Sequence, residues 1–517
     1  MTGRRYLLGI DIGTSGVRAA IFDEDGNLVS LGRRGYEFQH PHPGWSELDA
    51  EEVWQKTIQA TRESIAQGPV APERILTIGL SAPAHSSIPV DENCRPVYPA
   101  IQSIDRRDNG YEHYLAWFRE RFGAEAIFKR SSFTLGSLTP PILPLLWLRD
   151  HRPDVFSRIR KSVLFQDFAV WRLTGTPALD YSMASGTMVF DPWQQDWIDE
   201  FLDAAGITRE FFSPLSPSAQ PVGILKEDVA REIGLPAGTM VVPGAHDLGC
   251  AAIAVGLSRE GMAADVIGSF EALATVVAEP VSSLDMLRRG QASECHAYPG
   301  LYLAVGFSVT AGSLIRWYAH QMCEWEREQA CQQGKDPYDL ITEAASTSPP
   351  GARGLLVLPH WSGAGTGRIP PLNADSRGAI LGLNLSHTKA DLSRAVFEGI
   401  AYEARIIIES MESSGLRIDE LVATGGGAKS RFLLQLKADV TGKQVVLPRV
   451  AEASLLGAAM LAGVGAGVYA DVAEAISRVS RIEAVFEPVA ANKGIYDERF
   501  ALYRELYQTV VNLSARL

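Results

Sequence analysis

Cysteine is scarce in this chain of 517 residues, and its few copies form no recognisable pattern. The 5 cysteines are odd in number and include no Cys-x-x-Cys pair, so the sequence indicates neither a disulfide framework nor a zinc knuckle. This usage is typical of reduced thiols, and a strand pattern starts soon after Met1 with no signal peptide before it. We therefore expect a cytoplasmic protein.

Positive charge is also in short supply. The chain has 48 Lys and Arg against 61 Asp and Glu, a net charge of −13, and no basic stripe. We therefore expect neither nucleic acid nor a membrane surface as a partner. Residues 453–470 are apolar enough to raise the question of a membrane span. Their many Ala and Gly instead predict a buried, closely packed helix and its exit turn.

Two common nucleotide-binding motifs are missing. The sequence has no G-x-x-x-x-G-K-[ST], which excludes a P-loop. No G-x-G-x-x-G follows an early strand either, which removes the main support for a dinucleotide-dependent oxidoreductase.

The residues that are present are organised around an N-terminal turn. Two apolar runs within residues 6–22 predict strands joined by the tight turn Gly13-Thr14-Ser15. Backbone N–H groups and hydroxyls in such a turn form an anion site that suits phosphate. Asp11 lies where this site opens, at a place suited to a carboxylate that holds Mg²⁺ on those phosphates. A plain hairpin with a polar tip accounts for this segment equally well.

A second copy of this pattern favours the phosphate interpretation. Residues 267–277 again read as an apolar strand, a glycine with a hydroxyl (Gly268 and Ser269), and another apolar strand. A repeat at half the chain length predicts two similar domains, residues 1–256 and 257–517, each presenting a hairpin to one phosphate chain.

Strands and helices alternate along both halves, which predicts an α/β fold. Residues 108–238 are expected to be mainly helical. In the second half the periodicity predicts helices at 309–331, 388–414, 429–441 and 452–462, and strands at 355–358, 420–424 and 444–448.

Three positions are candidates for contact with a substrate. Asp247 follows the strand predicted over 240–243, where it can serve as a general base or cap the next helix. His85 follows another buried strand, as a ligand for hydroxyls or as a structural histidine. Asp105 can pair with Arg106 or Arg107 as easily as with a ligand.

With these residues assembled, the chain resembles the FGGY family of carbohydrate kinases over nearly its whole length. The resemblance is carried by ordered motifs: Gly9–Ser15 with Arg18, Leu173–Gly175 with Asp180, Ser182 and Ala184-Ser185, Pro243–Asp247, Ala311–Ser313 before Arg316, Ser376–Gly378, Glu398–Ala401, Gly425–Gly427, and Glu452 with Gly457–Ala459.

The resemblance implies the actin-like ATPase fold, with two ribonuclease-H-like domains around a central cleft. It also implies an ATP-dependent carbohydrate kinase whose second domain binds ATP and whose first domain binds the sugar or polyol. The implied roles are Asp247 as catalytic base; Asp11 for Mg²⁺; Gly13, Thr14, Ser15, Arg18, Gly268, Ser269, Gly312, Arg316, Gly425, Gly426 and Ser430 for ATP; and Ala84, His85, Asp105 and Asp247 for the substrate.

The chain departs from the family's pattern at several of these positions. Gly268-Ser269-Phe270-Glu271 stands where Gly-Thr-Gly or Gly-Thr-Ser is usual, and Ser430-Arg431 replaces a common asparagine. Ala84 replaces the arginine that glycerol kinases use, which counts against glycerol. Only Arg95 is a cation near the His85 loop, which disfavours a sugar acid.

We therefore expect a neutral ketose or sugar alcohol as the substrate, with xylulose-like compounds as the first choice. We also expect the protein to be a homodimer. Two alternatives from other classes stay open. One is an actin-like ATPase that is not a kinase, which would need either a peptide-binding domain or a cysteine pair for an iron–sulfur cluster. The other is a sugar-binding regulatory protein without turnover, which would need a DNA- or partner-binding extension.

Overall fold

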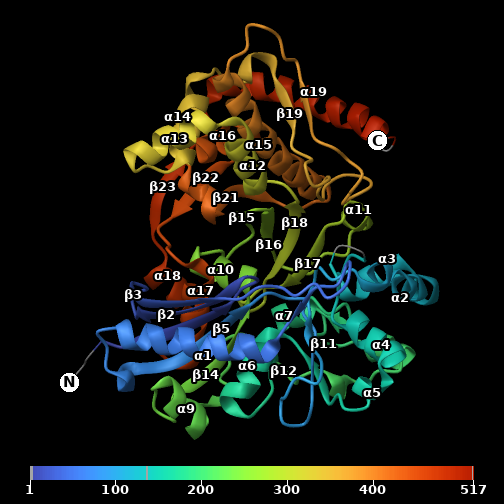
Figure 1. The fold of residues 1–517 in the computed structure, drawn as a ribbon, viewed down its shortest axis with the longest axis vertical. Coiled ribbons are helices and arrows are strands. Elements are labelled where there is room, and N and C mark those ends of the chain that lie inside the picture. The colour runs from blue at the N-terminus through green and yellow to red at the C-terminus, as the bar shows by residue number, and fades with distance from the viewer. Residues whose placement is uncertain (1–3, 136–137, 515, 517) are drawn as a thin grey trace.

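A computed structural model describes residues 4–135, 138–514 and 516. The two halves of the chain form two lobes, with the first half below and the second half above in the view of Figure 1. Each lobe is built on its own β-sheet. No helix in this described part of the chain is long and apolar enough to cross a membrane.

The first sheet takes all its strands from residues 6–246, in the order β13-β14-β5-β1-β2-β3. The first three strands in sequence run antiparallel, β5 and β14 then add in parallel to β1, and β13 closes the edge in antiparallel orientation. The strands are β1 (Tyr6–Ile12), β2 (Gly16–Asp23), β3 (Leu28–Gly35), β5 (Ile75–Ala82), β13 (Gly223–Ile224) and β14 (Met240–His246).

The second sheet repeats this topology within residues 261–486. Its order is β17-β18-β16-β15-β21-β22-β23, so β15, β16, β18, β21, β22 and β23 correspond to β1, β2, β3, β5, β14 and β13. The added strand β17 pairs with β18. The bounds are β15 (Gly261–Ile267), β16 (Glu271–Val277), β17 (Ala292–Cys295), β18 (Tyr302–Ser308), β21 (Ile418–Thr424), β22 (Gln444–Pro448) and β23 (Ile482–Phe486).

The Ala- and Gly-rich segment is a buried helix, α17 (Ala453–Gly465), as its composition predicts. It packs on β1 and β5 of the first sheet and on α10 (Asp247–Ala254). The approach is so close that a Cβ on Gly79 would lie 2.0 Å from the Ala458 carbonyl oxygen, and one on Gly457 only 1.8 Å from that of Cys250. Small residues therefore allow α17 and α10 to pack between the lobes (Figure 1).

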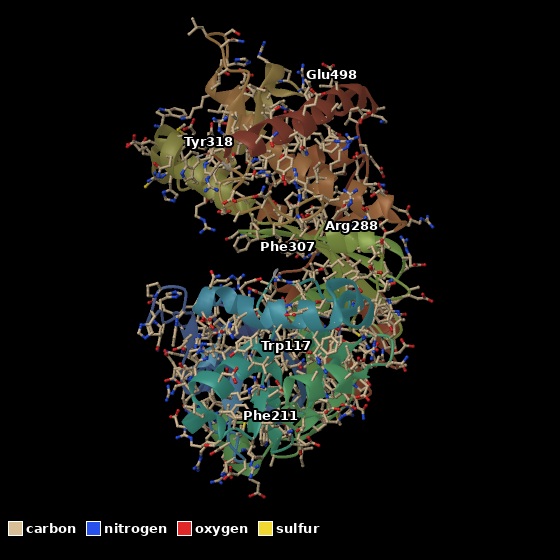
Figure 2. The ribbon with its side chains drawn as sticks, turned by 90° about the vertical axis from the view of Figure 1, so that its right-hand side faces the viewer. Trp117, Phe211, Arg288, Phe307, Tyr318 and Glu498 are labelled. Carbon is tan, nitrogen blue, oxygen red and sulfur yellow. The ribbon has the colours of Figure 1, made fainter. Side chains whose placement is uncertain are left out.

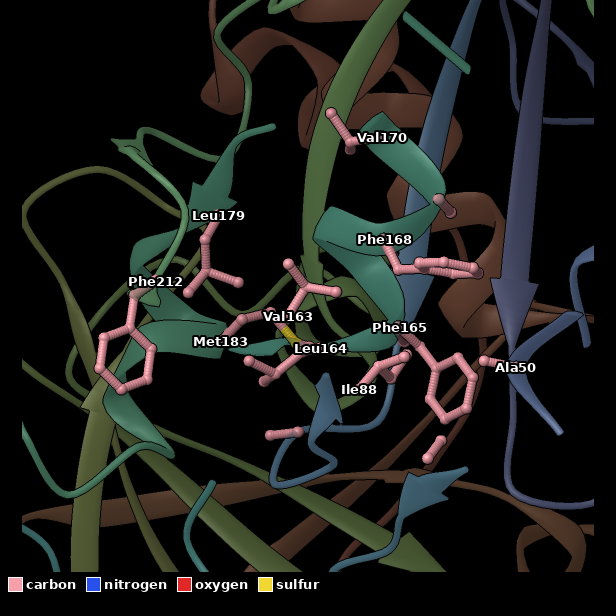
Figure 3. Packing of buried hydrophobic residues seen from close by; sticks show 14 of the residues in the cluster. Ala50, Ile88, Val163, Leu164, Phe165, Phe168, Val170, Leu179, Met183 and Phe212 are labelled. Atoms are coloured by element: carbon pink, nitrogen blue, oxygen red, sulfur yellow. The ribbon is translucent and has the colours of Figure 1, made fainter. Parts of the chain in front are cut away.

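The chain between β5 and β14 forms an insertion whose apolar residues pack in one cluster with those of the first sheet. Phe165 and Phe168 belong to a buried cluster that also includes Ile88 and Val163 (Figure 3). Besides the predicted helices, this region contains short paired strands. Its elements are α2 (Arg107–Phe122), α3 (Ala124–Ser131), α4 (Ile142–His151), α5 (Pro153–Phe156), α6 (Phe165–Thr174), α7 (Tyr181–Ser185), α8 (Asp199–Ala205), α9 (Glu227–Ile233), β6 (Ile88–Val90), β7 (Ala100–Ile101), β8 (Lys161–Val163), β9 (Leu179–Asp180), β10 (Phe190–Asp191), β11 (Asp196–Trp197) and β12 (Leu215–Ser216).

Helices cover the second sheet, and one prediction for them is wrong. The single helix expected over 309–331 is two helices, because the backbone of the buried Cys323 leaves the helical region (φ −123°, ψ 46°). Figure 2 shows Tyr318 of α12 in the upper lobe, with Trp117 of α2 in the lower one. The remaining elements are α1 (Ala50–Gln67), α11 (Leu284–Arg288), α12 (Gly312–Met322), α13 (Glu324–Gln333), α14 (Pro337–Thr347), α15 (Lys389–Ser413), α16 (Arg431–Thr441), α18 (Val472–Val479), α19 (Ala490–Ser514), β4 (Glu47–Leu48), β19 (Leu356–Leu358) and β20 (Ala379–Leu381).

Candidate active site

The turn between β1 and β2 opens into a cavity of about 510 Å³. The Gly13 N–H donates to the Gly16 carbonyl at 2.9 Å and closes the turn, while Thr14 and Ser15 remain exposed. Asp11 and Asp247 line the same cavity as this turn. The structure thus brings the predicted phosphate-binding turn together with Asp11, the predicted Mg²⁺ ligand, and Asp247, the predicted base.

Asp11 is held at the end of β1 by two donors. The Ser81 hydroxyl donates to Oδ1 at 2.7 Å, and the Arg18 guanidinium donates to Oδ2 at 2.5 Å. Arg18 also donates to Glu452 at 2.8 Å. Burial raises the pKa of Asp11, Arg18 lowers it and Asp247 raises it, with a net rise above the usual range. The contribution of Asp247 indicates that the two carboxylates lie close enough to interact electrostatically.

The second hairpin turn, between β15 and β16, is attached to the start of α12. The Gly312 N–H donates to the Gly268 carbonyl at 2.9 Å, and a Cβ on Gly312 would meet that oxygen at 2.5 Å. The Ser313 hydroxyl donates to the Ser269 carbonyl, and Arg316 donates to the Ser269 hydroxyl, each at 2.9 Å. Four residues predicted to contact ATP, namely Gly268, Ser269, Gly312 and Arg316, therefore form one assembly.

A buried cluster of Lys437, Asp265 and Glu271 adjoins this hairpin. The Lys437 ammonium of α16 donates to Asp265 at 2.5 Å and to Glu271 at 2.6 Å, and all three side chains are fully buried. Burial raises the pKa of Glu271 to about 8, with Lys437 lowering it and Asp265 raising it. The unusual Glu271 of the second hairpin thus joins the turn to α16. Sequence reasoning missed Lys437, since it is 166 residues away from its partner in the chain.

A second cavity, of about 920 Å³, borders the glycine turn after β21. Gly425 and Gly426 line it together with Lys429 and Arg431, which sequence reasoning did not single out. Gly425 has a φ of +85°, and a Cβ there would lie 2.7 Å from a carbonyl oxygen of β15. Both cavities include Arg18 and Ser454 in their linings, so they adjoin.

Ser430, also predicted to contact ATP, has a structural partner. Its hydroxyl accepts the Leu433 N–H at 3.2 Å and caps the N-terminus of α16. Its contact with a nucleotide stays a prediction.

Asp247 lies where β14 ends and α10 begins. Its side chain is 42% exposed, and Oδ1 accepts from Nε2 of His246 at 3.0 Å. Burial raises the pKa of Asp247, but His246, the Leu248 N–H and Arg18 together lower it more. The pKa therefore falls below the usual range, and the group is a carboxylate at neutral pH. The opposite nitrogen of His246 contacts Glu294 at 3.0 Å.

The predicted substrate loop follows β5. Ala84 is buried, whereas His85 is partly exposed and has a φ of +66°, which is uncommon for a residue with a side chain. His85 Nδ1 donates to the Gly186 carbonyl at 2.9 Å. Burial, together with the nearby His246, lowers the pKa of His85 to about 4. The ring is therefore neutral, and its Nε2 can only accept a hydrogen bond.

Asp105 belongs to a buried structural network. Its carboxylate accepts from Arg107 at 2.9 Å, from Tyr111 at 2.8 Å and from the backbone of Ser46 at 2.7 Å. The Arg107 guanidinium lies 4.0 Å from the ring centre of Trp45. Of the two possibilities for Asp105, pairing with an arginine is the one that the structure contains, and contact with a substrate stays untested.

The two lobes, each with a glycine turn between the first two strands of its sheet, have the actin-like ATPase fold. The chain belongs to the FGGY family of carbohydrate kinases: the family's N-terminal domain matches residues 6–254 and its C-terminal domain matches residues 269–466. It is accordingly a sugar kinase, a phosphotransferase with an alcohol acceptor, and ATP is its phosphate donor.

The relatives of this chain in the family are named for different substrates. The chain is 30% identical to a xylulose kinase of Staphylococcus epidermidis, with 99% of both chains covered. It is also 30% identical to a gluconokinase of Bacillus subtilis, over 99% of this chain and 96% of the relative. A crystal structure of xylulose kinase from Rhodospirillum rubrum superposes with a TM-score of 0.88, at 25% identity, over 99% of this chain and 100% of that one.

Proposed function

We propose that this kinase transfers the γ-phosphate of ATP to a hydroxyl of a neutral ketose or sugar alcohol, with xylulose-like substrates first. The observation that carries the proposal is the cavity in which Asp247 and Asp11 lie beside the first glycine turn. A base, a phosphate-binding turn and a second carboxylate within one cavity are the parts that phosphoryl transfer requires.

Phosphoryl transfer passes through a loose transition state, so these residues act mainly by positioning and by charge. Asp247 accepts the proton of the attacking hydroxyl as the oxygen–phosphorus bond forms. Its low pKa suffices because the proton leaves late. The N–H groups of Gly13 and Gly268 close their turns, and other backbone N–H groups of these two turns would face the phosphate oxygens on which charge accumulates.

Asp11 fits a role in holding Mg²⁺. Carboxylate oxygens are the ligands this ion prefers, and it commonly binds through one or two of them together with substrate phosphates. Burial is the main cause of the raised pKa of Asp11, and the nearby Asp247 carboxylate adds to the rise, so a cation bound beside Asp11 would stabilise its charged form. Bound there, Mg²⁺ would supply neutralisation of the phosphate charge.

Local charge supports a neutral substrate over a sugar acid. His85 is uncharged, and the cation at its side, His246, already contacts the two carboxylates of Asp247 and Glu294. Arg18, Arg33 and Arg34 also line this cavity, but each of them already pairs with a carboxylate: Arg18 with Asp11 and Glu452, Arg33 with Glu452, and Arg34 with Glu63. Pairing of these cations within the protein favours a neutral substrate over one that carries a carboxylate. The gluconokinase relative makes gluconate the competing candidate.

A coupled ADP-release assay across a substrate panel tests this proposal. The panel contains xylulose, ribulose and other ketoses, several sugar alcohols, glycerol and gluconate. We expect the highest kcat/KM for a neutral ketose or alditol. Preference for gluconate would refute the assignment of a neutral substrate, and ADP release that no sugar or polyol stimulates would refute the proposed transfer.

A further inference from the structure

His246, which the site residues predicted from the sequence do not include, lies between two carboxylates. Its Nε2 is 3.0 Å from Oδ1 of Asp247, and its Nδ1 is 3.0 and 3.1 Å from the two carboxylate oxygens of Glu294. The His246 and Glu294 side chains are only 15% and 13% exposed. The three residues form a continuous chain of contacts that ends at the proposed base.

The two hydrogen-bond partners of His246 determine its charge. Ionised carboxylates only accept, so each ring nitrogen must donate, and His246 must be an imidazolium. Burial lowers the pKa of His246, but Glu294 and Asp247 together raise it well above the usual range. His85, the other titratable group against His246, is neutral and does not compete for these carboxylates.

The two ends of this chain of contacts come from different halves of the protein. His246 is the last residue of β14 in the first sheet and Asp247 begins α10, whereas Glu294 lies on β17 of the second sheet. Helix α7 is attached to both: the Ser182 hydroxyl accepts the His246 N–H at 2.8 Å, and the Ser185 hydroxyl accepts the Cys295 N–H at 3.1 Å. Hydrogen bonds to α7 therefore hold the backbone on both sides of the contact between His246 and Glu294.

We propose that His246 and Glu294 are positioning residues for the Asp247 carboxylate, an inference that rests on the proposed function. His246 holds Oδ1 of Asp247 and thereby directs Oδ2 to the attacking hydroxyl. Glu294 keeps both His246 nitrogens protonated and fixes the plane of the ring, as an outer partner does for a catalytic histidine. Because Glu294 belongs to the second sheet, the orientation of the base depends on the placement of one half against the other.

An ion pair that only joined the two halves would behave differently. Its loss would lower thermal stability and leave the rate of the chemical step unchanged. Loss of a positioning residue lowers kcat and changes substrate binding far less, because the carboxylate that takes the proton is misoriented. Separate measurement of kcat and KM therefore distinguishes the two roles.

The test uses two substitutions of Glu294 and a matched control. For Glu294→Ala we expect kcat to fall about 10- to 100-fold, with KM for ATP and sugar within about threefold of wild type. Glu294→Gln retains an acceptor for Nδ1 without the charge, so its kcat should lie between those of the Ala variant and the wild type. Glu420→Gln is the control, because Glu420 also pairs with a cation, Arg259, from the second sheet and is 16% exposed. It should retain the wild-type kcat.

A spectroscopic measurement checks the same contact without turnover. Nitrogen-15 NMR of the histidine rings at neutral pH should show both His246 nitrogens protonated in the wild type. In Glu294→Ala, Nδ1 should lose its carboxylate partner and its chemical shift should move. An unchanged His246 spectrum in this variant would overturn the contact.

The two proposals fail in different ways. If the wild type phosphorylates no sugar or polyol, the proposed function is wrong. If the wild type is active and Glu294→Ala retains kcat within about threefold, the positioning role is wrong and the proposed function stands.

Discussion

Replacement of Asp247 by Asn tests in one measurement whether Asp247 acts as a catalytic base or only caps the start of α10. Asn has nearly the same size, and its Oδ1 still accepts from His246 Nε2, which is 3.0 Å away in the wild type. The amide cannot take a proton from the sugar hydroxyl. General base catalysis typically contributes about 10²- to 10⁴-fold, or about 3 to 5 kcal/mol, and we expect kcat to fall by that factor.

Stability should change little in the same variant. The Asp247 side chain is 42% exposed, so solvent screens its attraction to His246 and the pair contributes about 1 kcal/mol or less. Asn also serves well at the start of a helix. Thermal unfolding should therefore remain within a few degrees of wild type.

The assay is ADP release with ATP and sugar saturating, after a burst experiment has shown that chemistry limits the rate. The matched control is Asp285→Asn, since Asp285 is 38% exposed and pairs with Arg289 on α11. A kcat for Asp247→Asn within about threefold of wild type would refute the assignment of the base.

Three further predictions follow from the site. Asp11→Ala should abolish Mg²⁺-dependent turnover and retain the fold; near-normal activity in a Mg²⁺ titration would contradict its role. Gly312→Ala places a Cβ 2.5 Å from the Gly268 carbonyl oxygen, so KM for ATP should rise about tenfold, whereas Gly494→Ala, with no atom within 4 Å, should not change it. The folded-state pKa of Glu271, about 8, is above its unfolded value near 4.5, so the folded protein retains a proton between these pH values and the free energy of unfolding should fall as pH rises through this window. In urea unfolding, the free energy of unfolding should depend less on pH in Glu271→Gln than in the wild type. An equal pH dependence in the two proteins would contradict the role of the buried carboxyl group.

Local sequence patterns predicted most of the architecture. The helix predicted over 388–414 and the strands predicted over 355–358, 420–424 and 444–448 match the structure to within two residues at each end. Alternating apolar residues and the glycine turns carry that information within a few positions. The break at Cys323 has no comparable signal, because neither Gly nor Pro marks it.

The same local patterns predicted the phosphate turns but not the partners behind them. Arg18 and Glu452 form an ion pair across 434 positions of the chain, and Lys437 reaches Asp265 across 172. Periodicity identifies a buried face but does not identify the residue that it meets. For this reason the charge states of His246 and Glu271 could not be assigned from the sequence.

The sequence by itself determined the duplicated α/β architecture, the two glycine turns and the carboxylate that follows β14, because each depends on neighbours close in the chain. Only the tertiary structure decided that Asp105 pairs with Arg107, that Ser430 caps α16, and that Glu294 reaches His246 from the other half. The physical reason is that electrostatic contacts depend on distance in space, and the packing of α17 and α10 between the sheets sets those distances.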